Sequence, residues 1–109
     1  MKHALHKGRE FASVYDEGRS RANRFVVMYV KKNDIGDNRI GIVASKKIGN
    51  SVVRHRVKRL IRESLRQNGE KFGIGLDIIV IARRNCVGRT QAEITEAVLQ
   101  AAGQHGITV

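Results

Sequence analysis

The sequence predicts an α+β fold in which helices pack against a mixed β-sheet. Helical and strand patterns follow one another in the order α-β-β-α-β-α. A helix separates the last two strands, and such a β-α-β arrangement makes two strands parallel. The chain has 109 residues, of which 41% are hydrophobic, so it is long enough for one packed core. We therefore expect a single domain over residues 1–109.

The first predicted element is a short amphipathic helix over residues 8–17. Phe11, Val14 and Tyr15 stand there at i, i+3 and i+4, which is the spacing of one helix face. Gly18 follows, and a glycine at this place is a common stop signal. The helix should therefore bury one side and expose the other.

Three segments have the composition of strands. Residues 24–31 are rich in β-branched and aromatic side chains. The polar stretch 33–38 is a turn, so residues 39–45 should form a second strand that is antiparallel to the first. Residues 76–82 are almost entirely aliphatic and predict a buried third strand.

Two longer helices are marked by capping residues. Asn50 or Ser51 can cap a helix that runs to about Asn68. Thr90 begins the last helix, and Glu93, three residues later, completes a capping box. Both helices follow strands, as the predicted order requires.

Positive charge is concentrated in one part of the chain. Residues 46–66 hold eight Lys or Arg and a single acid, Glu63, so this segment carries +7 of the formal net charge of +11. Charge of this density predicts a polyanion-binding surface. A membrane is a poor partner, because no apolar run reaches the ~20 residues of a spanning helix and no signal peptide is expected. Composition favours nucleic acid.

A helical wheel separates residues 52–66 into an apolar face and a basic face. The apolar face consists of Val53, Val57, Leu60, Ile61 and Ser64, with Leu65 at its edge. The basic face consists of His55, Lys58, Arg59, Arg62 and Arg66, with Arg54 and Arg56 on its flanks. Arginine forks fit phosphate oxygens, and the free N–H groups at the helix N-terminus, beside Lys46 and Lys47, offer a further phosphate site.

A charged helix face can also be a solvated surface, but such a face normally mixes signs. Here Arg54, Lys58, Arg62 and Arg66 follow one another at i, i+4 and repel, so we interpret the face as a binding surface. DNA is a competing ligand, although the segment is not a helix-turn-helix and no zinc ligands or heptads accompany it. The residues favour RNA without excluding DNA.

Two motifs stand out around this helix. The first is SKK-x-G-N over residues 45–50, and the second is R-x-R-x-K-R-x-x-R over residues 54–62. With REF-x-x-V-Y-x-x-G at 9–18 and DIIVIAR at 77–83, the chain resembles the bacterial ribonuclease P protein family. Two positions depart from the family pattern: His55 stands where the family has Asn, and Ala4 stands where Arg is usual.

The resemblance implies an α/β sandwich, a ribosomal-protein-like RNA-binding domain whose β-α-β unit crosses over with left-handed sense. It also implies a cytoplasmic subunit of an endoribonuclease, in which the partner RNA matures the 5′ end of precursor tRNA with bound Mg²⁺. No catalytic side chain and no metal site are expected in the protein. The expected contacts with the catalytic RNA are Lys46, Lys47, Asn50, Arg54, His55, Arg56, Lys58, Arg59, Arg62 and Arg66.

The resemblance further implies a cleft between the first helix and the sheet that takes the single-stranded 5′ leader of precursor tRNA. The matching positions are Phe11, Tyr15 and Tyr29, with Lys7, Arg9 and Lys31 as backbone contacts. From the residues alone, Phe25, Val27 and Tyr29 share one strand face, and core packing explains the aromatic residues equally well. Base stacking tolerates any sequence and contributes about 1–3 kcal/mol per base, which suits leaders of varied sequence.

The residues offer little for catalysis by the protein itself. The acids are scattered, and no D-x-D or E-x-x-H arrangement would build a two-metal site. His3 and His6 are better explained as part of a frayed terminus than as a metal pair. Cys86 is expected to be a small semi-buried apolar residue, and as the single cysteine it cannot form an intrachain disulfide, which fits a reducing cytosol. The other functions that these residues allow are a ribosomal or RNA-chaperone protein and a protein-only nuclease.

Overall fold

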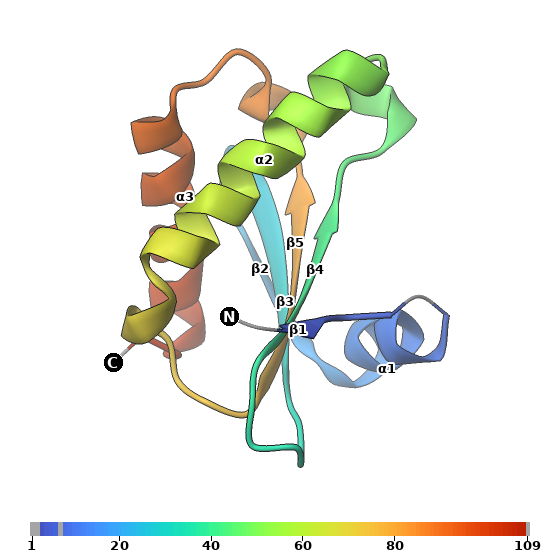
Figure 1. Cartoon of the computed structure of the whole chain (residues 1–109), viewed down its shortest axis with the longest axis vertical. Helices are drawn as coiled ribbons and strands as arrows, with labels where there is room; N and C mark the ends of the chain where they lie inside the picture. Colours follow the sequence, from blue (N-terminus) through green and yellow to red (C-terminus); the bar gives the residue numbers. More distant parts are fainter. Residues whose placement is uncertain (1–2, 7, 109) are drawn as a thin grey trace.

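The computed structural model describes residues 3–6 and 8–108 and contains a five-stranded sheet with helices on both faces (Figure 1). The strands are β1 (His3–Ala4), β2 (Arg19–Ala22), β3 (Val26–Lys32), β4 (Arg39–Val43) and β5 (Leu76–Ala82). The α-helices are α1 (Arg9–Glu17), α2 (Ser51–Gln67) and α3 (Gln91–His105). The 3₁₀ turns are η1 (Lys46–Ile48), η2 (Gly69–Lys71) and η3 (Arg84–Cys86). The predicted order of elements is present, with two short strands added.

The aliphatic strand β5 lies at the centre of the sheet, whose order is β1-β4-β5-β3-β2. It is parallel to β4, as the β-α-β arrangement predicted, and antiparallel to β3. The first two predicted strands, β3 and β4, run in opposite directions as expected, but β5 lies between them, so they do not pair with each other. The reason is burial, because Ile78, Ile79 and Val80 are fully buried and only a central strand is covered on both faces.

The crossover from β4 through α2 to β5 is left-handed. In Figure 1 both strands run upward, α2 passes in front of the sheet, and β5 lies to the left of β4. The general rule for parallel strands is a right-handed crossover, which would place β5 on the other side. The fold class that the family resemblance implied is confirmed.

The edge strands β1 and β2 were not predicted, because neither shows the alternation of a half-buried strand. All four residues of β2 are exposed. The strand is held by its antiparallel register with β3 and by Asn23, whose Oδ1 accepts hydrogen bonds from the N–H groups of Phe25 and Val26 in the connecting turn. β1 is two residues long and pairs with β4.

Both long helices begin at predicted caps. Asn50 Oδ1 accepts a 3.0 Å hydrogen bond from the N–H of Val53, and α2 ends at Gln67. Thr90 and Glu93 form the capping box of α3. None of the helices in the described ranges is both long and apolar enough to cross a membrane.

The two faces of the sheet carry separate cores. On one face, α2 and α3 cover Val26, Met28 and Val30 of β3. On the other face, α1 covers a smaller cluster that contains Val14 and Ile79. Side chains alternate along β3, so its odd-numbered residues face α1. The sheet therefore presents two chemically different sides for function.

Candidate nucleic-acid interface

Helix α2 buries one side and exposes the other, as its sequence predicted. Val57, Ile61, Ser64 and Leu65 are buried. The opposite side forms the cationic face, which we define as His55, Arg56, Lys58, Arg59, Arg62 and Arg66. Lys58 is half-buried and the others are exposed. The buried side fixes the helix to the sheet, so these basic side chains project from a rigid support.

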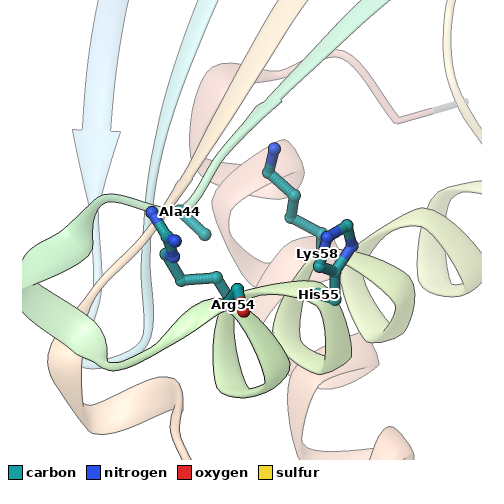
Figure 2. Close-up of a pocket in the computed structure, with 5 residues that line it drawn as sticks. Ala44, Arg54, His55 and Lys58 are labelled. Carbon is teal, nitrogen blue, oxygen red and sulfur yellow. The ribbon is translucent and has the colours of Figure 1, made fainter.

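Two of the hollows on the surface lie along this helix. One is lined by Ser51, Val52, His55, Arg56, Arg59 and Arg62. The other, of about 220 Å³, is lined by Ala44, Ser51, Arg54, His55 and Lys58. Figure 2 shows Arg54 extended toward Ala44, with His55 and Lys58 on the other side of the space. Nitrogen groups thus border a hollow at the helix N-terminus, where the backbone dipole also favours an anion.

Arg54 has a donor without an acceptor. Its Nε is buried and has no hydrogen-bond partner among the described residues. A buried unpaired donor costs about 1–3 kcal/mol. The same guanidinium lines the second hollow, where a phosphate oxygen would supply an acceptor.

Glu63 neutralises one end of the cationic face. Its carboxylate accepts hydrogen bonds from Arg66, including one of 2.9 Å from Nε, and from Gln67 at 3.1 Å. The hydrogen bond from Arg66 is the main reason that the pKa of Glu63 lies below its usual value. No other residue of the cationic face forms an ion pair with a carboxylate in the described part of the chain. The unpaired charge therefore lies toward the start of α2.

The segment before α2 adds charge and sets the start of the helix. Lys46 and Lys47 lie in η1 and are exposed. Asn50 was predicted as an RNA contact, but its side-chain oxygen is occupied by the cap to Val53. Gly49 has φ 153°, and a Cβ there would lie 2.8 Å from a methyl carbon of Val53, so glycine allows the chain to pass close to the helix.

α1 and β3 bring together the three aromatic residues predicted for the leader. The ring centroids of Phe11 and Tyr15 lie 6.4 Å apart, and those of Tyr15 and Tyr29 lie 4.9 Å apart in an edge-to-face arrangement. We define these three residues as the aromatic cluster. Tyr15 is 38% exposed, and the other two are half-buried. Burial, and then the neighbouring Tyr29, raise the pKa of Tyr15, so its hydroxyl is protonated at neutral pH.

An apolar strip crosses four strands beside this cluster. Val43, Ile81, Val27 and Ala22 are paired in register from β4 to β2. Ala22 is exposed and the other three are half-buried. Val43 and Ile81 pack against the core under α1, so the strip lies on the face of the aromatic cluster. Sequence reasoning missed this strip because its members come from separate strands.

Phe25 does not belong to this surface, contrary to the sequence prediction. β3 begins at Val26, and the Phe25 ring packs with the core under α2 and α3. The guanidinium carbons of Arg24 and Arg89 lie 5.3 Å and 4.9 Å from its centroid. The alternation of side chains does not extend to Phe25 because the residue lies in the turn before the strand.

A partly buried ion-pair network, centred on the buried Asp77, holds α1 over the sheet. Arg39 donates hydrogen bonds of 2.8 Å and 2.7 Å to Asp77 and one of 2.7 Å to Glu10 of α1. Asn33 donates another to Asp77 at 2.8 Å. Burial alone raises the pKa of Asp77, but these hydrogen bonds and the charges of Arg39 and Lys31 outweigh it, so the pKa lies below its ordinary value. The position of α1 therefore depends on β4 and β5.

Gly41 allows the aromatic cluster to lie against the sheet. A Cβ at this position in β4 would lie 2.6 Å from Cζ of Phe11 and 3.3 Å from a methyl carbon of Leu5. Such a distance is well inside ordinary carbon contact. The ring of Phe11 therefore occupies the space that a side chain would need.

The basic residues predicted to contact the RNA backbone near the cluster differ in whether they already have protein partners. Lys31 Nζ donates to Ser13 Oγ at 2.6 Å and lies 3.7 Å from the carboxylate of Glu17, so it also holds α1. Arg9 is exposed in the first turn of α1. Lys7 lies outside the described residues.

Metal-ligating side chains do not cluster in the described part of the chain. No group of three or more His, Cys, Asp or Glu side chains there would hold a metal ion. His6 is engaged with Glu10 through its backbone N–H, and the side chain of His3 is not among those described. His55 faces hollows without a carboxylate. Burial raises the pKa of Cys86 to about 11, so this thiol is a core residue rather than a nucleophile.

Comparisons with known proteins support the family that the sequence motifs predicted. The ribonuclease P family matches residues 1–105. The ribonuclease P protein component of Lachnoclostridium phytofermentans is 48% identical over 107 residues, which cover 98% of this chain and 92% of that protein. The ribonuclease P protein component of Alkaliphilus metalliredigens is 50% identical over 95 residues, which cover 87% and 86%.

Solved structures support the same assignment. The RNase P protein of Staphylococcus aureus superposes over 100% of both chains with a TM-score of 0.88 and 32% identity. The RNase P protein of Thermotoga maritima covers 94% of this chain and 97% of its own, with a TM-score of 0.86 and 29% identity. Sequence, fold and motifs agree, and the family predicted from the sequence is confirmed. The chain belongs to the ribonuclease P protein family.

Proposed function

We propose that this chain is the protein subunit of ribonuclease P and assists its catalytic RNA in the endonucleolytic 5′ maturation of precursor tRNA. The observation that carries the proposal is the cationic face of α2. In the described structure Arg66 is paired with an acid, whereas the rest of this face has no protein counter-charge. A rigid, uncompensated row of basic groups fits a folded polyanion.

The catalytic RNA would bind along η1 and α2. Lys46 and Lys47 precede the helix, and the hollow beside Arg54 offers a place for one phosphate at its N-terminus. Arg59 and Arg62, one turn apart, would meet further phosphates along the same strand of RNA. This arrangement supplies charge neutralisation together with a fixed orientation.

The 5′ leader of precursor tRNA would bind on the opposite face of the sheet. Tyr15 and Tyr29 present ring surface beside the apolar strip, and Arg9 stands at the start of α1. Every base has a flat face, so stacking there would tolerate leaders of different sequence. Lys31 would contribute through the position of α1 as well as through its charge.

Hydrolysis is proposed to be carried out by the RNA with bound Mg²⁺. The described residues do not fit a protein metal site, so no chemical step is assigned to their side chains. The protein would hold substrate and catalytic RNA together, which lowers the entropic cost of the encounter and the repulsion between two polyanions. We place this work in the cytoplasm, where a buried free thiol such as Cys86 stays reduced.

Reconstitution tests the proposal directly. The purified chain is mixed with ribonuclease P RNA and a precursor tRNA at low Mg²⁺, where RNA alone reacts slowly because its charges repel. We expect the protein to stimulate cleavage at the mature 5′ end, and the protein without RNA to be inactive. Binding without stimulation would favour a ribosomal or RNA-chaperone role, and cleavage by the protein alone would indicate a protein-only nuclease.

A further inference from the structure

The outer strand β2 carries a second basic surface that the proposed function does not use. Arg19 and Arg21 are exposed, and neither forms an ion pair with a carboxylate among the residues described. Strand order places β2 at the edge of the sheet opposite β1 and β4. Helix α2 packs on β4, β5 and α3, so this surface is distinct from the cationic face.

A hollow of about 370 Å³ lies beside Arg19. Its floor is apolar, with Val30, Leu76 and Ile107, and its rim carries Arg19, Lys32 and His105. Glu17 also lines it, and its carboxylate lies 3.7 Å from Lys31 Nζ. An apolar floor with a cationic rim fits a nucleotide, whose base is flat and whose phosphate is charged.

The pKa of His105 responds to its burial and to the positive charge around the hollow. Its Nε2 lies 2.7 Å from the backbone oxygen of Met28. Burial is the main cause that lowers the pKa of His105; the hydrogen bond to Met28 opposes this, and the charges of Arg21 and Arg19 lower it further. The two arginines therefore add positive potential at His105, on the rim of the hollow.

The β2 edge is continuous with the aromatic cluster. Ser20 lies directly opposite Tyr29 in the β2–β3 register, while Arg19 and Arg21 on either side of it point to the other face, opposite Val30 and Met28. Neighbouring strands are about 4.8 Å apart, so a single RNA strand that leaves Tyr29 reaches the edge within one nucleotide. Lys31 connects the two regions, because it contacts Ser13 of α1 and also lines the hollow.

We propose that the β2 edge binds the sugar–phosphate backbone of the leader beyond the nucleotides stacked on the aromatic cluster, with Arg19 and Arg21 as the phosphate contacts. The inference rests on the proposed function, which places the catalytic RNA at α2. The leader would then enter from the β4 side, cross the aromatic cluster and leave over β2. The nucleotides at β2 are therefore those farthest from the cleavage site.

A leader-length series with the reconstituted holoenzyme tests this path. Precursor tRNAs whose leaders grow one nucleotide at a time are bound to the wild type and to the double variant Arg19→Gln/Arg21→Gln. For the wild type we expect affinity to rise in two stages, first at the aromatic cluster and then at the β2 edge. The double variant should lose the second stage alone, roughly five- to tenfold for the longest leader, with a salt slope lower by about 1.4.

Arg84→Gln is the matched control. It removes the same kind of charge from an exposed position that follows β5, at the other end of β3 from Arg19. We expect it to leave the second stage in place. If the double variant keeps the second stage, or loses affinity equally for leaderless and long-leader substrates, the β2 assignment is overturned.

The wild-type series separates this inference from the function on which it rests. If the wild type stimulates cleavage but shows a single stage only, the proposed function stands and the β2 site is refuted. If the wild type shows no leader dependence at all, the leader role of the aromatic cluster fails as well. Thermal melting of each variant, with an expected change within a few degrees for exposed positions, shows that the folds are equivalent.

Discussion

The cationic face and the aromatic cluster are built in opposite ways. The cationic face comes from successive turns of one helix, and within the described structure a single acid, Glu63, is paired with it. The aromatic cluster joins α1 to β3. Its Phe11 ring fits against β4 because Gly41 has no side chain, and the ion pairs of Arg39 hold α1 in place. One surface requires only a docked helix, whereas the other requires the assembled sheet.

The two surfaces should also respond differently to solution conditions. Exposed charges lose their reach when the Debye length falls to about 10 Å at 0.1 M salt. Ring stacking and burial depend little on salt. Binding of RNA to α2 should therefore weaken steeply with ionic strength, whereas stacking of leader bases on the aromatic cluster should depend little on salt.

The substitution with the largest expected effect is Asp77→Ala, which should disrupt the aromatic cluster and leave the cationic face intact. Asp77→Ala removes the acceptor of hydrogen bonds from Arg39 and Asn33 and leaves the partly buried Arg39 guanidinium with Glu10 as its remaining carboxylate partner. We expect the free energy of unfolding to fall by about 3–5 kcal/mol, measured by urea denaturation. α1 should loosen with it, because Glu10 loses a correctly oriented Arg39.

The pH dependence of stability provides the control. The pKa of Asp77 is depressed in the folded protein, so its contribution is present above the ordinary value of 3.8 and is lost as the pH falls through the folded value. The wild type should therefore lose stability in acid more steeply than Asp77→Asn. Parallel acid profiles for the two proteins would contradict the role given to this ion pair.

A smaller effect is expected from Tyr29→Ala, which removes one ring from the aromatic cluster. Loss of a stacked base should weaken binding of leader-bearing precursor tRNA by about 1–3 kcal/mol. Tyr29→Phe keeps the ring and should bind nearly as the wild type. Equal losses for leaderless and leader-bearing substrates, measured in parallel titrations, would remove the leader from this surface.

Next come changes to the cationic face. Arg59→Ala and Arg62→Ala should each lower the slope of log affinity against log salt by about one for the catalytic RNA. The fold should be unaffected because both side chains are exposed. Arg59→Lys keeps the charge and should keep most of the slope. A slope that does not change in either Ala variant would mean that these arginines do not contact phosphate.

The smallest expected effect is a gain in affinity for the catalytic RNA. Glu63→Gln releases Arg66 from its ion pair and should tighten binding of the catalytic RNA about twofold at low salt. Glu96→Gln removes an equal charge from an exposed position on α3 and serves as the control. The same gain in both variants would show that only net charge matters and that Arg66 makes no specific contact.

These two surfaces also differ in how well the sequence predicted them. The faces of α2 and the caps at Asn50 and Thr90 depend on residues within a few positions of each other, so their spacing was sufficient. The central place of β5 was not predictable from local pattern, because strand partners are chosen by burial across the whole sheet. For this reason the opposite directions of β3 and β4 were predicted, but not the insertion of β5 between them.

The aromatic cluster shows where prediction from the residues alone ends. The helical spacing of Phe11 and Tyr15 was visible, but their meeting with Tyr29 followed only from the family resemblance. The pair Arg39–Asp77 joins residues 38 positions apart and leaves no signal in a single sequence. The same holds for the exposed strand β2, which has no apolar alternation to mark it.

The central position of β5 has a consequence for the order in which the molecule can form. β3 and β4 are synthesised first and pair with the earlier edge strands β2 and β1, but they are joined into one sheet only through β5, which is complete only at residue 82. Long-range pairing of this kind slows folding. A nascent chain therefore carries its most basic segment, with the apolar side of α2 still uncovered, before the strand that organises the sheet exists. During this interval an acidic surface would contact the positive charge of residues 46–66 before the protein has folded.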